Sequence, residues 1–553
     1  MSSSSLPKPP LPLPPPPSPP LLPTSTSSLL HPRRRSLLSA FASSCSLLLS
    51  SFFWLSLILS TSPFPPSLSH PSHSHRLRFH ESTPPPPDPS SPLSLNHLVF
   101  GIAGSAHLWP RRKEFVRLWW RPGSMRGHLV FGIAGSAHLW PRRKEFVRLW
   151  WRPGSMRGHI WLDSSPFSSS QSSVVSPSPD SADLPPIRIS EDISQFRYTN
   201  PTGHPSGLRI ARILAESFRL GHQAARWFVL VDDDTIVNVD NLVAVLSKYD
   251  WTEMVYVGGP SESHSANTYF SHTMAFGGGG IAISYPLARA IEGIQDECLE
   301  RYPRFYGSDD RLHACISELG VPLTREYGFH QWDIRGSTHG LLAAHPIAPF
   351  ITIHHVEAVN PVFPGLNSLQ SLQLFTKAMK AEPMSFLQRA LCYDEAHKLS
   401  ISVSLGYVVQ VYPTVVLPRD LERSEVTYTA WNKLGHRNEF DFDTRDAFRS
   451  ICKKPVRFFL KDVWKEGNVT KGLYVRERSR NDLKRKVFCF PRLPPLPGVD
   501  EIQVFSDPLS KNWHLAPRRL CGELNQTVGG TGTLTILVRQ CHRETFGSAV
   551  DTL

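Results

Sequence analysis

The sequence predicts an α/β domain with a mostly parallel sheet, followed by a β-rich C-terminal module. Three observations carry this prediction. Apolar runs typical of strands alternate with helical patterns between residues 128 and 249. A short apolar run at 227–231 directly precedes three aspartates, as expected at the end of a central parallel strand. From about residue 385 onward, strand patterns continue while helical patterns become scarce.

The elements of the α/β part follow in order along the chain. Strands are expected at 128–135, 158–163 and 227–231, and helices at 141–151, 206–220 and 241–249. The helix at 206–220 is the clearest, because its apolar residues recur at helical spacing: Leu208, Ile210, Ile213, Leu214 and Phe218. Residues 164–186 are rich in Ser and Pro and predict a long loop.

The β-rich module is expected over residues 381–553. Alternating and β-branched residues predict strands at 401–412, 427–430 and 456–460. Prolines at 493–498 predict a loop that interrupts the module.

The N-terminal part of the chain has a different composition. Residues 1–35 and 61–96 are rich in Pro and Ser and predict a tail and a stem without a core. Residues 36–60 carry no charge, follow three arginines and predict a transmembrane signal anchor with the larger part of the chain beyond the membrane. A cleaved signal or transit peptide is the alternative.

A 31-residue segment occurs twice without change, as 97–127 and 128–158. The second copy runs directly into the strand at 158–163, so we expect it to be the structural one, with the first looping out or competing for its place. Each copy carries six Lys or Arg and one Glu, so one copy accounts for +5 of the net charge of +12. The remaining mild excess, without a nucleic-acid-binding motif, predicts no nucleic acid as partner.

The strongest chemical signal is the triplet Asp232, Asp233 and Asp234. Adjacent carboxylates repel one another unless a cation neutralises them, and a hard divalent ion such as Mn²⁺ or Mg²⁺ prefers such oxygen ligands. The end of a parallel strand is also where ligands bind in open α/β sheets. A solvated acidic turn is the alternative. An EF-hand is excluded, because its sixth and twelfth positions are Val237 and Val243.

Three further motifs bear on this site. The run of four glycines at 277–280 allows a close approach of the backbone to a ligand, although a flexible turn explains it equally well. Asp309 and Asp310 precede a helical pattern, where they fit either a helix cap or a general base. His354 and His355 form a pair that could ligate a metal.

Together these motifs resemble the plant fringe-related glycosyltransferases, type II membrane proteins of the β-1,3-glycosyltransferase group. The resemblance rests on 227–235, 275–284, 306–311 and 353–357 and covers about 97–380, with a less sharp likeness in the C-terminal module. It implies a GT-A-like domain at 128–380, a UDP-sugar donor, Mn²⁺ and inversion at the anomeric carbon. It further implies a Golgi membrane protein with a lumenal catalytic domain and a glycan or glycoprotein acceptor.

The resemblance also assigns roles by position. Asp234 and His355 are implied as metal ligands, with His354 as the alternate to His355. Asp310 is implied as the catalytic base. The implied donor-binding residues are Asp232, Asp233, Gly278, Gly279 and Asp309. Cys298 and Cys315 are implied to form a disulfide.

Seven cysteines lie outside the apolar segment, so an odd one is expected to stay free or to pair outside the chain. Asn468 and Asn525 lie in glycosylation sequons. Two other functions compete with glycosyl transfer: a carbohydrate-binding or scaffold protein that has lost catalysis, and a metal-dependent phosphohydrolase. Binding of UDP-galactose, UDP-glucose or UDP-N-acetylglucosamine would require nearly the same motifs, so the sequence does not identify the donor sugar.

Overall fold

The computed structural model describes residues 98–103, 130–135, 159–164 and 187–541. The last range has gaps at 223, 233–234, 357, 432–438, 479–483, 486, 490–495, 497 and 526–532. All of these residues belong to the second of two compact units, 81–553. The predicted tail, membrane anchor and stem lie outside them. Among the helices that are described, none combines the length and apolar character needed to cross a bilayer.

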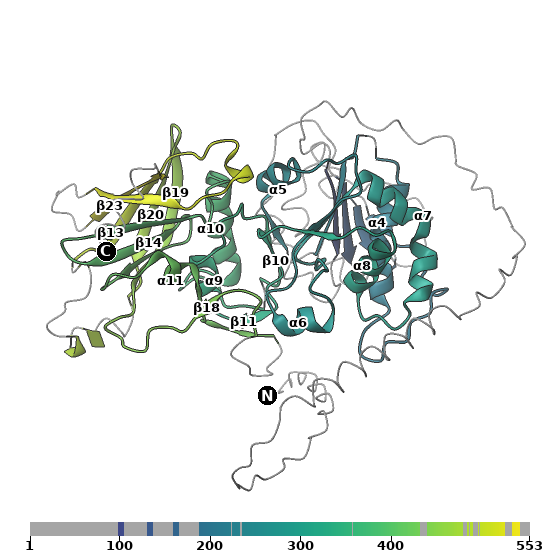
Figure 1. The fold of residues 1–553 in the computed structure, drawn as a ribbon, viewed down its shortest axis with the longest axis horizontal. Helices are drawn as coiled ribbons and strands as arrows, with labels where there is room; N and C mark the ends of the chain where they lie inside the picture. Colours follow the sequence, from purple (N-terminus) through teal and green to yellow (C-terminus); the bar gives the residue numbers. More distant parts are fainter. Residues whose placement is uncertain are drawn as a thin grey trace, which may run out of the picture. The chain divides into compact units, whose positions relative to one another are not determined.

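The N-terminal part of the described chain is built on an eight-stranded sheet (Figure 1). In spatial order its strands are β4 (Ile187–Ile189), β3 (His159–Leu162), β2 (Val130–Gly135), β1 (Leu98–Ala103), β5 (Trp227–Asp232), β8 (Ile281–Ser284), β7 (Tyr256–Gly258) and β9 (Leu323–Arg325). The strands from β4 to β5 are parallel to one another. Strand β8 is antiparallel to β5 and β7, and β9 is again parallel to β7.

Both copies of the repeated segment contribute a strand to this sheet. Strand β1 of the first copy pairs with β5, and β2 of the second copy lies between β1 and β3. The two identical strands pair in register, with Val99 opposite Val130. The expectation that only the second copy has a structural place is therefore wrong. Because the copies are identical, their strands offer the same ladder of hydrogen-bonding groups, and the sheet accommodates the second by adding a strand.

Strand β5 shows why the centre of the sheet is fully apolar. Its residue Phe228 packs with one core cluster, while Trp227, Val229 and Val231 pack with another. Alternate residues of a strand point to opposite faces of the sheet, so both faces of β5 are covered by other parts of the chain. The predicted strand at 227–231 is confirmed.

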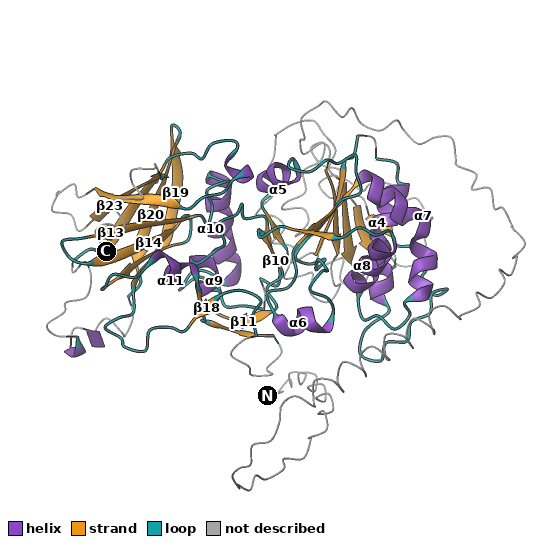
Figure 2. Cartoon of the chain, viewed as in Figure 1, coloured by secondary structure: helices purple, strands orange, loops and turns teal. Residues whose placement is uncertain are grey.

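One face of the sheet is covered by helices α4 (Ser206–Arg219), α7 (Tyr285–Arg301) and α8 (Ser308–Glu318), which pack on one another (Figure 2). Helix α4 confirms the helix expected at 206–220. The helix expected at 241–249 begins and ends slightly earlier, as α5 (Val239–Leu246). The disulfide between Cys298 and Cys315 is confirmed and joins α7 to α8.

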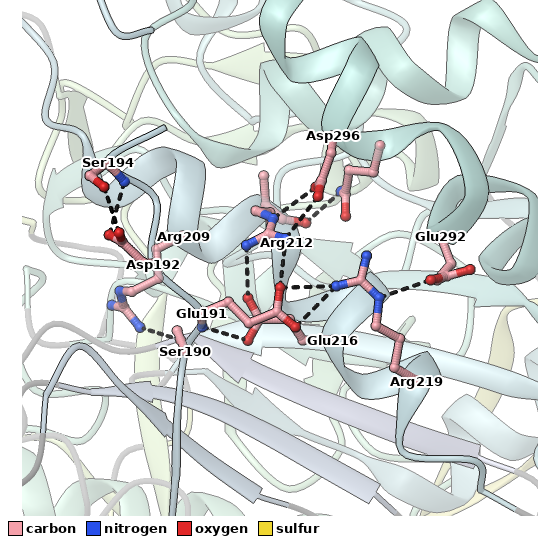
Figure 3. Close-up of polar contacts among 12 residues, drawn as sticks. Ser190, Glu191, Asp192, Ser194, Arg209, Arg212, Glu216, Arg219, Glu292 and Asp296 are labelled. Carbon is pink, nitrogen blue, oxygen red and sulfur yellow. Dashed lines mark hydrogen bonds and ion pairs between the residues drawn. The ribbon is translucent and has the colours of Figure 1, made fainter. Parts of the chain in front are cut away.

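A network of ion pairs joins α4 to α7 and to the segment after β4 (Figure 3). The buried Arg212 guanidinium lies 2.7 Å from Glu191, 2.9 Å from Asp296 and 3.7 Å from Glu216. Arg219 pairs with Glu191 and with Glu292 on α7. These acidic groups are thus neutralised by arginines that lie beside them.

Short elements connect this part to the C-terminal module. They are β6 (Ile236–Val237), α6 (His264–Tyr269), β10 (Phe329–His330), β11 (Ile334–Gly336), α9 (His339–Ala343), β12 (Thr352–Ile353), α10 (Ser368–Ala381), α11 (Pro418–Glu422), β16 (Ser424–Glu425), β17 (Tyr428–Ala430) and β18 (Thr444–Arg445). Strand β12 lies between β10 and β6, β16 pairs with β18, and β17 pairs with β11.

The C-terminal module contains a closed β-barrel, which confirms the expected β-rich character. Its strands are β13 (Arg389–Asp394), β14 (Leu399–Ser404), β15 (Val408–Tyr412), β19 (Val456–Glu466), β20 (Val469–Arg476), β21 (Glu501–Ser506), β23 (Thr533–Gln540) and β22 (Leu520–Asn525), which returns to β13. The single strand expected at 401–412 is instead two strands. They are joined by a turn in which Gly406 has a φ of +78°.

The barrel and the sheet share one hydrophobic core. A single cluster of buried residues extends from β5 and α5 through α10 to the strands of the barrel. In the described part of the chain two further disulfides join Cys452 to Cys489 and Cys521 to Cys541, and a short 3₁₀ helix occupies Trp513–Leu515. Cys392 stays free and buried, which confirms the expected odd cysteine. Asn468 and Asn525 are exposed.

Candidate active site

Strand β5 carries Asp232 to the carboxyl-terminal edge of the sheet. The turn that follows is closed by Thr235, whose hydroxyl accepts the Asp232 N–H at 3.2 Å and donates to the Gly278 carbonyl at 2.7 Å. The turn is thereby tied to the glycine run. Asp233 and Asp234 lie outside the described residues, so their implied roles in donor and metal binding stay predictions.

The glycine run allows two functional side chains to approach the backbone closely. A Cβ atom on Gly277 would lie 2.6 Å from Asp309 Oδ1, and a Cβ atom on Gly278 would lie 2.1 Å from the His354 ring. No side chain larger than hydrogen fits at either position without moving these groups. Glycine is therefore required here by close packing.

Of the two neighbouring histidines, His354 faces Asp232. Its Nε2 lies 3.3 Å from Asp232 Oδ2, and its Nδ1 lies 3.2 Å from Gln331 Oε1. The same Gln331 oxygen accepts the Gly279 N–H at 2.8 Å, so this amide orients both the imidazole and the glycine run. The His354 side chain is almost fully buried.

His355, the implied metal ligand, points to a different set of groups. Its Nδ1 lies 3.2 Å from Asp333 Oδ1, and its ring stacks on that of Trp431 at a centroid distance of 5.0 Å. Its ring also stacks on that of His354, with the two centroids 3.8 Å apart, so the two imidazoles lie side by side while their nitrogens meet different carboxylates. The structure thus brings the alternate histidine, His354, to Asp232.

Trp431 reaches this site from the C-terminal module and was not expected from the sequence. Strand β17 pairs antiparallel with β11 and ends directly before Trp431. The Trp431 N–H donates to the Asp333 carbonyl at 2.9 Å, and the Arg335 guanidinium lies 4.6 Å from the indole centroid. The pairing joins residues almost 100 positions apart, so it does not follow from a local pattern. The strand expected at 427–430 was the one signal in the sequence for this part of the site.

Asp309 lies at the start of helix α8 with its carboxyl group turned inward. Burial raises the pKa of Asp309 to about 7, and the negative charge of Asp232 adds to the rise. Hydrogen bonds from the Gly277 N–H and the Ser308 hydroxyl act in the opposite direction. Asp232, Gly277 and Asp309 line one small pocket. The arrangement provides a carboxyl group able to exchange a proton near neutral pH.

Asp310, the implied catalytic base, caps the same helix. Its Oδ2 accepts the Tyr306 N–H at 2.7 Å, and its Oδ1 accepts the N–H groups of Gly307 and Arg311 at 3.0 and 2.9 Å. Burial raises the pKa of Asp310, while these three bonds oppose the rise. Its oxygens already accept backbone donors, which is the role of a cap. Of the two neighbouring aspartates, it is Asp309 that faces Asp232.

Two family models match the chain. Residues 192–338 match the family described as fringe-like, and residues 266–522 match a family described as a protein of unknown function, DUF604. The first match contains Asp232, the glycine run and both Asp309 and Asp310. The second extends into the barrel.

Relatives with known activities match part of the chain. A β-1,3-glucosyltransferase from Mus musculus is 32% identical over 119 residues, which cover 22% of this chain and 23% of that protein. The β-1,3-N-acetylglucosaminyltransferase lunatic fringe from Gallus gallus is 38% identical over 19% of this chain and 33% of that protein. The chain thus spans about a quarter to a third of these relatives.

Solved structures also show likenesses, at low TM-scores. An active-site mutant of LgtC has a TM-score of 0.30 at 10% identity, covering 50% of this chain and 93% of that one. Mouse xyloside xylosyltransferase 1 has a TM-score of 0.26 at 9% identity, covering 40% and 81%. At these values we base no argument on them. The family models and the relatives agree: the chain carries a fringe-like segment at 192–338, which holds the candidate site, and β-1,3-glycosyltransferases are among the proteins to which part of the chain is similar.

Proposed function

We propose that the chain is a metal-dependent, inverting hexosyltransferase with a GT-A-like donor-binding domain. It would move galactose, glucose or N-acetylglucosamine from a UDP-sugar to a hydroxyl of a glycan or glycoprotein, in a β-1,3 linkage. The observation that carries the proposal is the convergence of Asp232, Asp309, His354 and the glycine run at the end of β5. The fringe-like match over 192–338 and the similarity of part of the chain to β-1,3-glycosyltransferases support it.

The residues at this edge fit a divalent cation. Asp232 offers a carboxylate and His354 an imidazole 3.3 Å away, and both are donor types that Mn²⁺ accepts. We propose these two as ligands, together with Asp234, while His355 remains the ligand implied by the resemblance. When bound, the cation would neutralise the diphosphate of the UDP leaving group.

We assign the general base to Asp309. A base with a pKa near the working pH combines a useful ionised fraction with a strong pull on the proton, and the pKa of about 7 meets this condition. Asp309 would take the proton of the acceptor hydroxyl as that oxygen attacks the sugar from the face opposite UDP. Asp310 would then act by holding the start of α8 in position through its three N–H bonds.

The glycine run would bind the donor through its backbone. Gly278 and Gly279 are held in place by Thr235 and Gln331, so their position does not depend on a bound ligand. Asp233 would contact the donor beside them. A rigid backbone surface that is already in place reduces the ordering cost of binding.

The membrane anchor at 36–60, the Golgi location and the lumenal orientation are predictions from the sequence. The same is true of the assignment to the plant branch of the family.

A second candidate function is carbohydrate binding without catalysis. It is favoured by the place of β1, which lies directly beside the strand that ends in Asp232 and is there because of the exact repeat. An additional strand at this point could alter the donor pocket while leaving glycan binding in place.

The test is UDP release by the purified full chain with Mn²⁺ and a panel of UDP-galactose, UDP-glucose and UDP-N-acetylglucosamine. We expect release with one donor, loss of release on chelation, and loss in Asp309→Asn. Asp310→Asn is the matched variant and should retain more activity than Asp309→Asn. Mn²⁺-dependent UDP binding without release from any donor, with a glycan acceptor present, would favour the second candidate. Absence of UDP binding would overturn the glycosyltransferase proposal.

A further inference from the structure

A second group of metal-ligating side chains lies away from the candidate active site. His264 begins helix α6, His272 follows that helix, and Asp441 belongs to the C-terminal module. One ligand atom from each residue lies within 4.8 Å of the others. The fold therefore brings two imidazoles and one carboxylate together from three separate positions in the chain.

Both histidines direct the same ring nitrogen toward the carboxylate. His264 Nδ1 lies 2.6 Å from Asp441 Oδ1, and His272 Nδ1 lies 3.1 Å from Asp441 Oδ2. The two imidazole centroids are 5.4 Å apart. Ligands of one zinc ion at about 2.0–2.2 Å lie roughly 3–3.5 Å from one another, so small side-chain shifts would give metal-binding geometry.

The surrounding residues hold these three groups in position. The Asn267 amide donates to Asp441 Oδ2 at 2.6 Å, and the Asn267 side chain is itself buried. His264 Nε2 lies 3.3 Å from the Thr268 hydroxyl, so the second ring nitrogen also has a hydrogen-bonding partner. A partner of this kind on the second nitrogen is usual for a histidine that binds a metal.

The backbone also joins the two segments. Ser263 forms an antiparallel bridge with Phe440, and the His264 N–H donates to the Glu439 carbonyl at 2.7 Å. The Asp441 N–H donates to the Glu262 carbonyl at 3.3 Å. The ligand positions are therefore fixed by the fold and do not depend on flexible side chains alone.

The group is open to solvent on one side. The side chains of His264 and His272 are 51% and 52% exposed, and that of Asp441 is 22% exposed. A cation could therefore enter and keep one or more water ligands. Hydrogen bonding alone explains a single His–Asp pair such as His397 with Asp394. Here two imidazoles meet one carboxylate, each through its Nδ1, so the group offers three ligand atoms where the His397–Asp394 pair offers two.

We propose that His264, His272 and Asp441 bind a divalent transition-metal ion of the zinc class. Two imidazoles and one carboxylate are the donor set that such borderline ions prefer. The ion would fasten the segment at 261–272, which leads into the glycine run, to the C-terminal module at 439–443. This site is separate from the cation proposed at Asp232, and it does not depend on the proposed function.

The test is calorimetric titration of the full chain with Zn²⁺. Every sample carries Asp232→Asn, so that the candidate active site does not contribute. We expect one site whose affinity falls at least about tenfold in His272→Ala and in Asp441→Asn, because removing a ligand costs no less than removing a supporting group. His397→Ala is the matched control and should keep the affinity. Zn²⁺ should also raise the Tm, but not in His272→Ala.

Two outcomes would overturn the inference. One is a Zn²⁺ affinity that changes less than about tenfold in both ligand variants, since a lost ligand must cost more than this. The other is an X-ray absorption spectrum of the Zn²⁺-loaded chain without imidazole scattering. The spectrum needs no ligand variant, so a lack of imidazole scattering would overturn the inference even if His272→Ala or Asp441→Asn fails to fold.

Discussion

Two clusters of acidic side chains lie beside the central sheet, and they differ in the charged groups next to them. Around helix α4, Glu191, Glu216 and Asp296 pair with the buried Arg212 (Figure 3). At the end of β5, no arginine or lysine pairs with Asp232 or Asp309 among the described residues, and only His354 lies within ion-pair distance of Asp232. The first cluster is complete without a ligand, whereas the second lacks a positive charge.

A raised pKa does not separate these two clusters. Burial raises the pKa of Glu216 to about 7, just as it does for Asp309. A neighbouring carboxylate adds to the rise in both cases, Glu191 at Glu216 and Asp232 at Asp309. The difference is that Arg212 and Arg219 oppose the rise at Glu216, whereas no arginine or lysine is among the causes at Asp309. A shifted acid thus marks a functional site only where the fold supplies no cation of its own.

The largest expected effect is on catalysis. Asp309→Asn should lower the rate of UDP release by about 10²–10⁴-fold, because the acceptor hydroxyl loses its base. Glu216→Gln removes a carboxyl group of similar pKa from the arginine cluster and should leave the rate largely unchanged. The measurement is UDP release at saturating donor. An equal loss of rate in Asp309→Asn and Glu216→Gln would contradict the distinction between the two clusters, because the effect would then come from replacing any buried acid.

Removal of the arginine should act on stability. Arg212→Met should lower the free energy of unfolding by about 3–5 kcal/mol, because it leaves the buried Glu216 without its ion-pair partner, whereas Glu191 keeps Arg219. The measurement is urea denaturation, and Mn²⁺-dependent UDP binding should persist under native conditions. Arg301→Met is the control, since Arg301 pairs with Glu318 on an exposed face and should matter far less. If Arg212→Met lowers the free energy of unfolding by less than about 1 kcal/mol, Arg212 contributes no more than an ordinary surface ion pair.

The pH dependence of stability should reflect the raised pKa of one acid in each cluster, Asp309 and Glu216. Asp309 has a folded pKa of about 7 against an ordinary value of 3.8, so between about pH 4 and 7 the folded state holds a proton that the unfolded state has lost. Its contribution to stability is therefore complete below pH 4 and falls as pH rises to 7, by up to about 1.4 kcal/mol per unit. Glu216 acts in the same direction from 4.5 to about 7.

Urea denaturation of the wild type, Asp309→Asn and Glu216→Gln across pH 4–8 measures these slopes. Each variant should remove part of the fall in stability between pH 4 and 7. A wild-type stability that rises steadily through this range, with the same slope in both variants, would contradict the pKa shifts.

The sequence predicts the framework of the site better than its contacts. The apolar run at 227–231, the helix at 206–220 and the glycine run each follow from local patterns, and all three lie where expected. The choice between Asp309 and Asp310 does not follow from local patterns, and neither does the choice between His354 and His355. Asp309 and Asp310 point about 100° apart around α8, and the direction that faces Asp232 depends on how the helix packs. His354 and His355 follow the short strand β12, and their contacts depend on Gln331, Asp333 and Trp431 from other parts of the fold.

Pairings between strands that are far apart in the chain could not be predicted from the sequence either. Trp431 arrives at the site through the pairing of β17 with β11, which no local pattern encodes. The place of β1 next to β5 was missed for a related reason, since identical strands are equally suited to either position in the sheet. Patterns specify which residues are buried in an element, but not which element becomes its neighbour.

The smallest effects come from single methyl groups, and they test how closely the glycine run fits the second cluster. In Gly278→Ala the new Cβ would meet the His354 ring at 2.1 Å. The ring is buried and held by Gln331, so it cannot move away freely, and we expect a loss of about 1–3 kcal/mol in stability. Displacement of His354 should also weaken Mn²⁺-dependent UDP binding.

Gly293→Ala adds the same methyl group on an exposed face of helix α7, where no atom lies within 4 Å of the new Cβ. Here alanine should stabilise the protein by up to about 1 kcal/mol, because it is the better helix former. Thermal unfolding and UDP titration of both variants measure the contrast. If Gly278→Ala is tolerated as well as Gly293→Ala, His354 is not confined against the backbone. It would then be free to leave Asp232, and the fit of a cation to this pair would lose its support.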